Sequence, residues 1–252
     1  MEKTKIMPIN STNDDIASLY IERGIIAIKE AISRKALSRL QKDLISLSGE
    51  DNSYELDRKL IQMNSHSDYS DLHNFQIAAS KLISLSSIAA DLYDYLCLIS
   101  QCNNPLFLSG VGFVLGLPQN QRLAYDWHQD GTYHEDSTKS TIHVWFPIFY
   151  PVSKENGTMS IHENTHTLGL RNFEKVRAHD KGYTTNKVID VDILVKDHAE
   201  LYCAMNTGDC LFFCDEIIHK SNINLSNSCR ITGVLKFSLS PSYDSHPGLV
   251  GV

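Results

Sequence analysis

The spacing of apolar residues changes near residue 105, from a helical period to a strand period. Before that point, Leu37, Leu40 and Leu44 follow the i, i+3, i+7 spacing of an amphipathic helix. Gly49 follows this stretch and is a typical residue to end a helix. The first part of the chain is therefore expected to be helical.

Three further ranges complete this helical part. Residues 12–30 mix helical apolar spacing with isoleucines that favour strands. Residues 50–70 are polar and are expected to form a connection, and 71–101 carry one long helical pattern. We expect these helices to brace one face of a sheet.

After Leu106 the pattern is typical of strands. Residues 111–117, 141–150 and 230–238 are strand-like, and 208–218 form a turn followed by an apolar strand pattern. In 141–150 the side chains alternate, so one face carries Ile142, Val144, Phe146 and Ile148 and the other carries His143, Trp145 and Pro147.

This order predicts a mainly β protein with flanking helices (α+β). Many strands over one stretch suit a double-stranded β-helix, the jelly-roll or cupin-like architecture, with N-terminal bracing helices. We expect a single domain over 1–252, with a helical part at about 1–105 and a β-helix core at about 106–240. The polar range 170–200 is expected to be an excursion over the barrel mouth, either a lid or an inert surface loop.

The most informative chemistry lies in residues 127–130, Trp-His-Gln-Asp. His128 and Asp130 are two residues apart, so on a strand both side chains would leave the same face. His219, placed at the end of the next strand pattern, would complete two imidazoles and one carboxylate, an arrangement that suits non-haem Fe(II) oxygenases. If His219 and Arg230 flank a hairpin, the guanidinium lies near the metal and can bind a carboxylate through two hydrogen bonds.

These residues resemble the phytanoyl-CoA dioxygenase family of Fe(II)- and 2-oxoglutarate-dependent oxygenases, from about residue 111 to 240. The shared parts are residues 127–130, Trp145, 156–161, 165–166, 208–209, 219–221, Asn224 and Arg230. One departure is that the family's Pro-Gly-Ser/Thr-His turn is replaced here by Glu-Asn-Thr-His at 163–166.

The resemblance implies roles for individual residues. His128, Asp130 and His219 would bind iron and carry catalysis, and Arg230 would hold the distal carboxylate of 2-oxoglutarate. Ser221 and Trp145 would line the co-substrate pocket. Tyr133 and His134 follow the first two ligands directly and are candidate substrate contacts.

The resemblance also implies a reaction. With Fe(II), 2-oxoglutarate and O2, the enzyme would release succinate and CO2 and hydroxylate a C–H bond of a small metabolite or biosynthetic intermediate. A carboxylate at Asp130 disfavours halogenation, because related halogenases have Gly or Ala there. Desaturation and ring formation stay open, as does the identity of the substrate.

Four other histidines lie in the same region, and none is expected to bind the metal. His162 and His166 are expected to be turn or rim residues, and His143 is expected to lie behind the ligands. His134 is left as a candidate substrate contact.

Composition indicates which classes of binding partner are unfavourable for this protein. A formal net charge of −7 and no long run of Lys or Arg disfavour nucleic acid and anionic membranes. No apolar stretch reaches the roughly 20 residues of a bilayer span, and the N-terminus has no signal-peptide core, so a cytoplasmic location is expected. The six cysteines contain no Cys-x-x-Cys pair, so no disulfide is expected. The oligomeric state is not indicated.

Two other functions fit the same residues. One is a cupin-type isomerase or dioxygenase that does not use 2-oxoglutarate and so has no need of Arg230. The other is a non-catalytic jelly-roll binding protein.

Overall fold

The computed structural model describes residues 4–6, 13–65, 70–101, 106–120, 124–133, 141–177 and 184–238. Its helices are α1 (Asn13–Arg23), α2 (Arg34–Ser48), α3 (Ser53–Ser65), α4 (Ser70–Ala79), α5 (Leu85–Ser100) and α6 (Val191–Leu194), with short 3-10 turns η1 (Asp130–Tyr133) and η2 (Thr165–Leu168). Its strands are β1 (Thr4–Ile6), β2 (Ile25–Ile28), β3 (Phe107–Gly116), β4 (Thr141–Pro147), β5 (Met159–His162), β6 (Phe173–Arg177), β7 (Thr184–Val188), β8 (Glu200–Cys203), β9 (Cys210–Cys214), β10 (His219–Ser221) and β11 (Arg230–Ser238).

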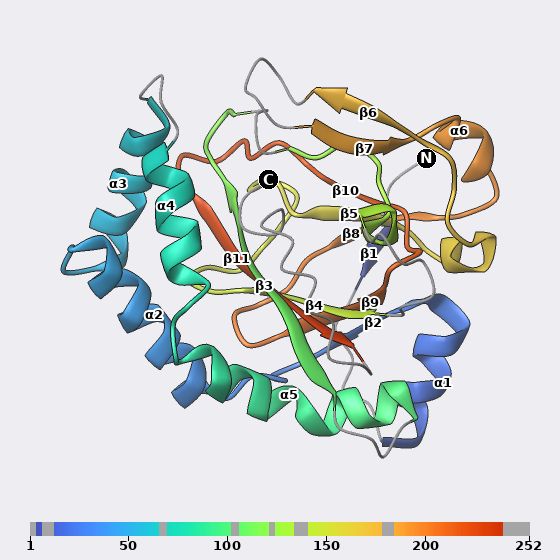
Figure 1. Ribbon diagram of the computed structural model, residues 1–252, viewed down its shortest axis with the longest axis horizontal. Helices are drawn as coiled ribbons and strands as arrows, with labels where there is room; N and C mark the ends of the chain where they lie inside the picture. Colours follow the sequence, from blue (N-terminus) through green and yellow to red (C-terminus); the bar gives the residue numbers. More distant parts are fainter. Residues whose placement is uncertain are drawn as a thin grey trace.

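Two sheets form the centre of the molecule (Figure 1). The larger has the order β2-β9-β4-β11-β3, and the smaller has the order β1-β8-β5-β10. Apolar residues from both sheets, among them Trp145 and Phe213 on one and Ile161 and Leu201 on the other, form one buried cluster between them. The predicted β-helix core with flanking helices is confirmed.

Strand β4 shows how the sequence pattern places side chains. Ile142, Val144 and Phe146 belong to the core that the larger sheet shares with the helices, whereas Trp145 belongs to the core between the sheets. The alternation predicted for this strand is confirmed. His143 therefore lies on the inner face, where it reaches other polar groups.

Helices α2 to α5 cover the outer side of the larger sheet (Figure 1). Helix α2 begins at Ser33, whose Oγ accepts a hydrogen bond from the backbone N–H of Ala36 at 3.2 Å. It ends at Gly49, which has φ 76° and satisfies the last carbonyls. The predicted amphipathic helix and its end are confirmed.

Residues 50–70 are not the polar connection that we expected. They contain α3, because Asn52 caps the N–H groups of Tyr54 and Glu55 and because Leu56 and Leu60 are fully buried one helical turn apart. Of the side chains that the structure describes in α3, only these two leucines are fully buried, and they gave a weak periodic signal in the sequence.

Residues 71–101 also differ from the prediction, since the pattern divides into α4 and α5. The break at 80–84 is closed by hydrogen bonds between residues three apart, as in the bond from Leu82 N to Ala79 O. In residues 12–30, Gly24 at φ 70° ends α1 and lets the chain enter β2, which accounts for the mixed pattern there.

The range 170–200 is more ordered than an irregular excursion. It contains the hairpin β6–β7, the short helix α6 and the start of β8. The hairpin is joined to the centre of the molecule by a hydrogen bond from Val188 N to Trp127 O at 2.9 Å. Beneath it, Trp127, Val188, Val195 and Ile218 form a small apolar cluster.

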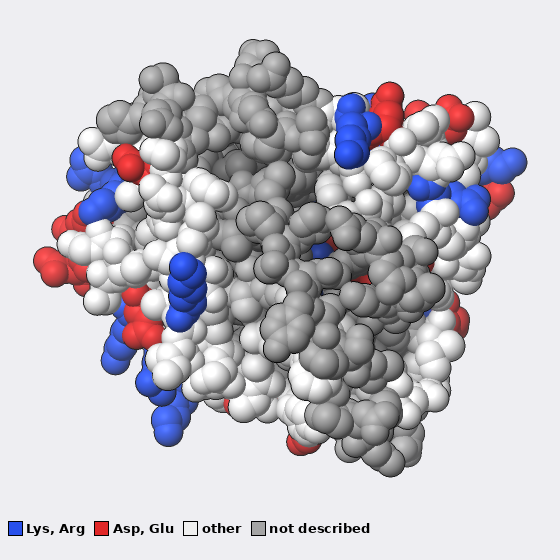
Figure 2. All heavy atoms as spheres, in the orientation of Figure 1, with Lys and Arg blue, Asp and Glu red and all other residues white. Residues whose placement is uncertain are grey.

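The structure also shows how charges are distributed on one face and the state of the cysteines among the described residues. On the face in Figure 2, the coloured Lys and Arg side chains are interspersed with Asp and Glu. The five cysteines in the described ranges are all free. Among the residues placed by the structure, no helix has the length and apolar character needed to cross a membrane.

Candidate metal centre and co-substrate site

His128, Asp130 and His219 converge between the two sheets, and their ligand atoms all lie within 4.8 Å of one another. Both histidines are buried, and the Asp130 side chain is 14% exposed. The Nε2 atom of His128 is 3.7 Å from Oδ1 of Asp130. The structure therefore brings together the three residues that the sequence assigned to iron.

Backbone pairing fixes the two histidines side by side. His128 N donates to His219 O at 2.9 Å, and His219 N donates to His128 O at 3.0 Å, so the two residues form a narrow antiparallel pair. The centres of the two imidazole rings are 4.1 Å apart.

The geometry behind this pair differs from the prediction in two respects. The segment 127–130 is not a strand: His128 makes an isolated bridge, and Asp130 begins the 3-10 turn η1. His219 also begins β10 instead of ending the preceding strand pattern, because β9 stops at Cys214. The tight turn after His128 still brings the carboxylate back beside the imidazole.

Each histidine presents the same nitrogen to the cluster. Nδ1 of His128 donates to Asp126 O at 2.7 Å, and Nδ1 of His219 donates to Ile217 O at 2.9 Å. Since a carbonyl can only accept, these contacts leave Nε2 with a free lone pair. Burial lowers the pKa of His128, and burial followed by repulsion from His128 lowers the pKa of His219 to about 3. Both imidazoles are held neutral, as metal ligands need to be.

Asp130 is held as a carboxylate. Burial by itself would raise its pKa, but Lys236 and His143 outweigh this effect and keep the pKa well below the usual range. Oδ2 of Asp130 lies 3.0 Å from Nδ1 of His143 and 3.6 Å from Nζ of Lys236.

His143 continues the network away from the cluster. Its Nε2 is 2.6 Å from Oδ1 of Asp215, and the other carboxylate oxygen of Asp215 accepts from Thr141 N at 2.7 Å. Burial and Lys236 act to lower the pKa of His143, but Asp130 and Asp215 outweigh them and raise it. The ring also stacks on Phe213, with centroids 4.9 Å apart. His143 lies behind Asp130, as expected.

Two neutral imidazoles and one ionised carboxylate within 4.8 Å of one another fit a divalent iron ion. This donor set leaves further coordination positions open, and it is typical of non-haem Fe(II) sites. Among the described residues, no other group of three such side chains comes together in this way.

Arg230 begins β11 and is 5% exposed. Its side chain crosses β3 at Gly116, where a Cβ atom would lie 2.7 Å from Nε, so the glycine is needed for this close approach. Burial lowers its pKa to about 10. Within the described ranges, Nε has no hydrogen-bond partner and no carboxylate forms an ion pair with the guanidinium.

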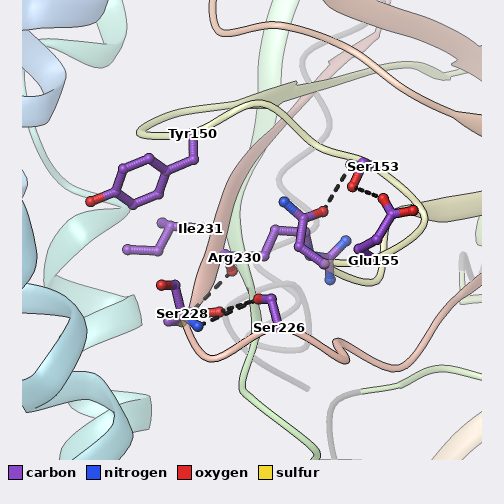
Figure 3. A pocket seen from close by; sticks show the side chains of 9 residues that line it. Tyr150, Ser153, Glu155, Ser226, Ser228, Arg230 and Ile231 are labelled. Atoms are coloured by element: carbon purple, nitrogen blue, oxygen red, sulfur yellow. Dashed lines mark hydrogen bonds between the residues drawn. The ribbon is translucent and has the colours of Figure 1, made fainter.

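A cavity of about 300 Å³ adjoins this arginine. Figure 3 shows Arg230 between the loop that carries Ser153 and Glu155 and the turn that carries Ser226 and Ser228. The residues that line this cavity do not include His128, Asp130 or His219, the candidate metal cluster. A buried guanidinium beside an open space suits a carboxylate.

The predicted hairpin between His219 and Arg230 is wrong. Strand β10 pairs with β5 in the smaller sheet, and β11 pairs with β3 and β4 in the larger one. Turn-forming residues between two strand patterns also occur where the chain crosses between sheets. Here Asn224 holds the crossing, because its Nδ2 donates to Gly116 O and Ser228 O.

The other proposed pocket residues are placed as follows. Trp145 is buried on the inner face of β4, and the partly buried Ser221 ends β10. The ring of Tyr133 lies 6.2 Å from that of His128, and its hydroxyl accepts from Asn186 N at 3.0 Å. Burial raises the pKa of Tyr133 to about 12. His134 lies outside the described residues.

His162 is not a turn or rim residue. It is the last residue of β5, it is buried, and its ring packs on Trp127 with centroids 4.3 Å apart. His166 lies in η2 and its Nε2 bonds to Ile21 O, which agrees with a turn position. Neither belongs to the metal cluster.

Four supporting residues were missed in the sequence. Asp215 and Lys236 surround Asp130 and His143. Gln129, fully buried, ties the ligand segment to Gly169 O, Glu216 O and Arg171 N. Asp57 on α3 accepts from Cys229 N, beside Arg230. One of these residues could have been found from the sequence. Lys236 stands in the apolar pattern of β11, and a buried lysine needs a polar partner.

Comparisons with solved structures give the same architecture. EctD from S. alaskensis with 2-oxoglutarate and 5-hydroxyectoine has a TM-score of 0.60 and 14% identity, covering 94% of this chain and 83% of its own. EvdO2 from Micromonospora carbonacea var. aurantiaca complexed with 2-oxoglutarate has a TM-score of 0.58 and 14% identity, and the match covers 96% of this chain and 97% of the EvdO2 chain. The epimerase SnoN in complex with Fe3+, alpha ketoglutarate and nogalamycin RO has a TM-score of 0.59 and 11% identity, and the match covers 90% of this chain and 83% of the SnoN chain.

At these identities the likeness concerns the fold. Among curated proteins, no significant sequence match was found. The family model for phytanoyl-CoA dioxygenase (PhyH), however, matches residues 20–232, a range that contains the metal cluster and Arg230. Together with the neutral two-histidine, one-carboxylate geometry, this match shows that the chain belongs to the phytanoyl-CoA dioxygenase family.

Proposed function

We propose that this protein is an Fe(II)- and 2-oxoglutarate-dependent oxygenase that hydroxylates a C–H bond of a small molecule. The observation that carries the proposal is the buried cluster of His128, Asp130 and His219, with ligand atoms within 4.8 Å and both imidazoles neutral. When bound, iron and 2-oxoglutarate supply the oxidising chemistry, with succinate and CO2 as co-products.

The chain's own residues hold and orient these groups. His128, Asp130 and His219 would hold the metal, and Arg230 would offer a fork of donors to the far carboxylate of 2-oxoglutarate. Trp145 and Ser221 are proposed to line the same pocket. Gly116 leaves the space in which the arginine lies.

We propose that aromatic side chains next to the site limit its access to water. Phe213 packs against His143 and lies edge-on to His219, with ring centroids 5.1 Å apart in the second contact. Trp127, which precedes His128 in the chain, packs on His162. A dry site strengthens the electrostatic interactions within it and protects reactive species from solvent.

Asp130 favours hydroxylation over halogenation, since its carboxylate takes the position that a halide would need. Substrate selectivity is proposed to lie with Tyr133 and His134, next to the ligand segment. SnoN is an epimerase, so the test of the reaction also has to register outcomes other than oxygen insertion.

The test is an incubation of the protein with Fe(II), ascorbate, 2-oxoglutarate and a fractionated metabolite extract. We expect succinate release that depends on a fraction, together with a product that is heavier by one oxygen. An unchanged mass with succinate release would replace hydroxylation by epimerisation. A loss of two hydrogens would indicate desaturation or ring formation.

The two other functions give different results. A cupin enzyme that does not use 2-oxoglutarate would show no shift of its thermal melt on addition of the co-substrate with Mn2+. A binding protein would show no succinate release with any fraction, in the presence of Fe(II).

A further inference from the structure

Lys236 is a buried cation next to the metal cluster. It lies on β11, opposite His143 in the strand register, and its side chain is 3% exposed. Arg230, Thr232, Val234 and Lys236 alternate with the outward-facing residues Ile231, Leu235 and Phe237, so Lys236 faces the space between the sheets. Within the described ranges, its Nζ has no hydrogen-bond partner.

The position of Nζ distinguishes the two oxygens of Asp130. Oδ1 faces Nε2 of His128 at 3.7 Å, on the side of the metal ligands. Oδ2 faces Nδ1 of His143 at 3.0 Å and Nζ of Lys236 at 3.6 Å. The ammonium therefore offsets the charge of Asp130, the one carboxylate of the metal cluster, from the side of Oδ2, which faces away from the histidine ligands.

A fixed positive charge at this distance opposes a dication. The attraction between a metal ion and Asp130 is partly cancelled by repulsion between the ion and Nζ, and burial limits the screening of both. The same positive charge attracts an anion that enters the open coordination positions. Lys236 thus weakens binding of the metal and strengthens binding of an anionic co-ligand.

We propose that Lys236 makes retention of the metal depend on a dianionic 2-oxo acid. The metal alone is bound weakly, and the metal with the dicarboxylate is bound tightly, since the dianion offsets the ammonium. This inference rests on the proposed function, because it takes the cluster as the metal site and 2-oxoglutarate as its co-ligand.

A merely structural role predicts the opposite result for the metal. If Lys236 served only to orient Asp130, its removal would loosen the carboxylate and weaken binding of the metal alone. If it opposes the metal by charge, its removal strengthens that binding. The two roles are therefore separated by the direction of the change.

The experiment measures Mn2+ binding by the paramagnetic resonance signal of the free ion, with and without saturating 2-oxoglutarate. The variants are Lys236→Met, which keeps the length without the charge, and Lys236→Arg, which keeps the charge. Lys220→Met is the matched control: it removes a charge next to His219 in the chain, but its Nζ faces Trp127 and Glu200. All four proteins are compared at one pH.

We expect Lys236→Met to bind Mn2+ alone about tenfold more tightly than the wild type. The factor by which 2-oxoglutarate tightens Mn2+ binding should fall by about tenfold as well. Lys236→Arg and Lys220→Met should each stay within about twofold of the wild type in both measurements. Thermal melts establish that each variant is folded, and Lys236→Gln replaces the Met variant if that one is not.

Equal or weaker binding of Mn2+ alone by the uncharged variant overturns the inference, as does a wild type in which 2-oxoglutarate does not tighten the metal. A wild type that binds neither Mn2+ nor 2-oxoglutarate overturns the proposed function instead. The two failures are thus distinct.

Discussion

The two histidine ligands are oriented by the same local contact. In each case Nδ1 donates to the carbonyl two residues earlier, Asp126 O for His128 and Ile217 O for His219. A metal-binding histidine commonly donates its other nitrogen in this way, which fixes the tautomer. At the scale of single residues, the cluster is thus prepared to bind a metal before one arrives.

Replacement of His128, Asp130 or His219 by alanine should abolish succinate formation, because each change removes one of three metal ligands. Binding of Mn2+, measured by the resonance signal of the free ion, should weaken in parallel, while the far-ultraviolet circular dichroism stays that of a folded protein. His73→Ala on the surface of α4 is the control. Normal turnover in any of the three variants would remove that residue from the metal site.

Replacement of Arg230 by alanine should raise the 2-oxoglutarate concentration for half-maximal rate by one to two orders of magnitude. Hydrogen bonds to charged groups contribute roughly 1.5–3 kcal/mol, and lysine keeps the charge without the fork. Arg230→Lys should therefore lie between alanine and the wild type. The measurement is the saturation curve, with Arg23→Ala on the surface as the control. An unchanged curve would exclude Arg230 from the co-substrate pocket.

At the scale of elements, the position of Arg230, the proposed co-substrate residue, depends on how β3 and β11 are paired. Gly116 lies opposite Arg230 in the register, and the arginine side chain crosses the glycine. Helix α3 adds to this arrangement, since Asp57 accepts a hydrogen bond from Cys229 N. The placement of one guanidinium thus depends on a pair of strands and a distant helix.

Gly116→Ala should therefore reproduce part of the Arg230→Ala defect. A Cβ at position 116 would lie 2.7 Å from Nε, so the guanidinium has to move. We expect the 2-oxoglutarate saturation curve to shift by about tenfold, while Mn2+ binding is retained. In the Arg230→Ala background, Gly116→Ala should add nothing, because the two changes act on one interaction. Additive effects would contradict this coupling.

The hairpin β6–β7 is held by the middle of β7 to the segment that carries His128 and Asp130. Asn186 on β7 donates from Nδ2 to Thr132 O at 3.0 Å, and its backbone N–H donates to the hydroxyl of Tyr133. Whether the hairpin also closes over substrate, as a lid, stays a prediction.

Asn186→Ala should make the hairpin more accessible to trypsin, because β7 loses its side-chain hydrogen bonds to Thr132. Cleavage after Lys175 and Arg177 should accelerate, while cleavage after the exposed Lys196 serves as the internal control. In the wild type, a lid predicts that iron, 2-oxoglutarate and substrate together slow cleavage after the first two residues. Cleavage that is indifferent to the ligands would identify an inert surface hairpin.

At the scale of the whole molecule, the buried histidines link stability to pH. Burial holds the pKa of His219 at about 3 in the folded protein, whereas the unfolded chain has the ordinary value of about 6.5. The unfolded state therefore binds more protons between these values. The free energy of unfolding should be largest above about pH 6.5 and should fall as the pH drops toward 3.

Denaturant melts of the metal-free protein across this pH range test the linkage. His219→Gln removes the titrating group. We expect this variant to lose less free energy of unfolding between about pH 6.5 and about pH 3 than the wild type, by an amount on the order of a few kcal/mol. His73→Ala removes an exposed histidine and should leave the slope as it is. An equal slope in all three proteins would show that His219 does not contribute to it.

Much of the fold and of the site could be read from local patterns. The helix over residues 34–48, the alternating strand at 141–147 and the pairing of His128 with Asp130 each depend on residues close together in the chain. Their signals are periodicity, capping and residue type, which act over a few residues. Helix α3 was missed since only two fully buried leucines mark it, and the strand geometry of 127–130 was wrong since a turn can also bring i and i+2 together.

Residue types and their spacing were enough to identify the candidate metal ligands and the arginine that accompanies them, and to predict that most strands follow residue 105. The assignment of β10 and β11 to opposite sheets became visible in three dimensions alone, because strand pairing is a non-local choice that turn residues do not fix. The tertiary structure also decided that Lys236, His143 and Asp215 surround Asp130. Buried charges have to be compensated in space, and their partners here come from strands and turns that lie far apart along the chain.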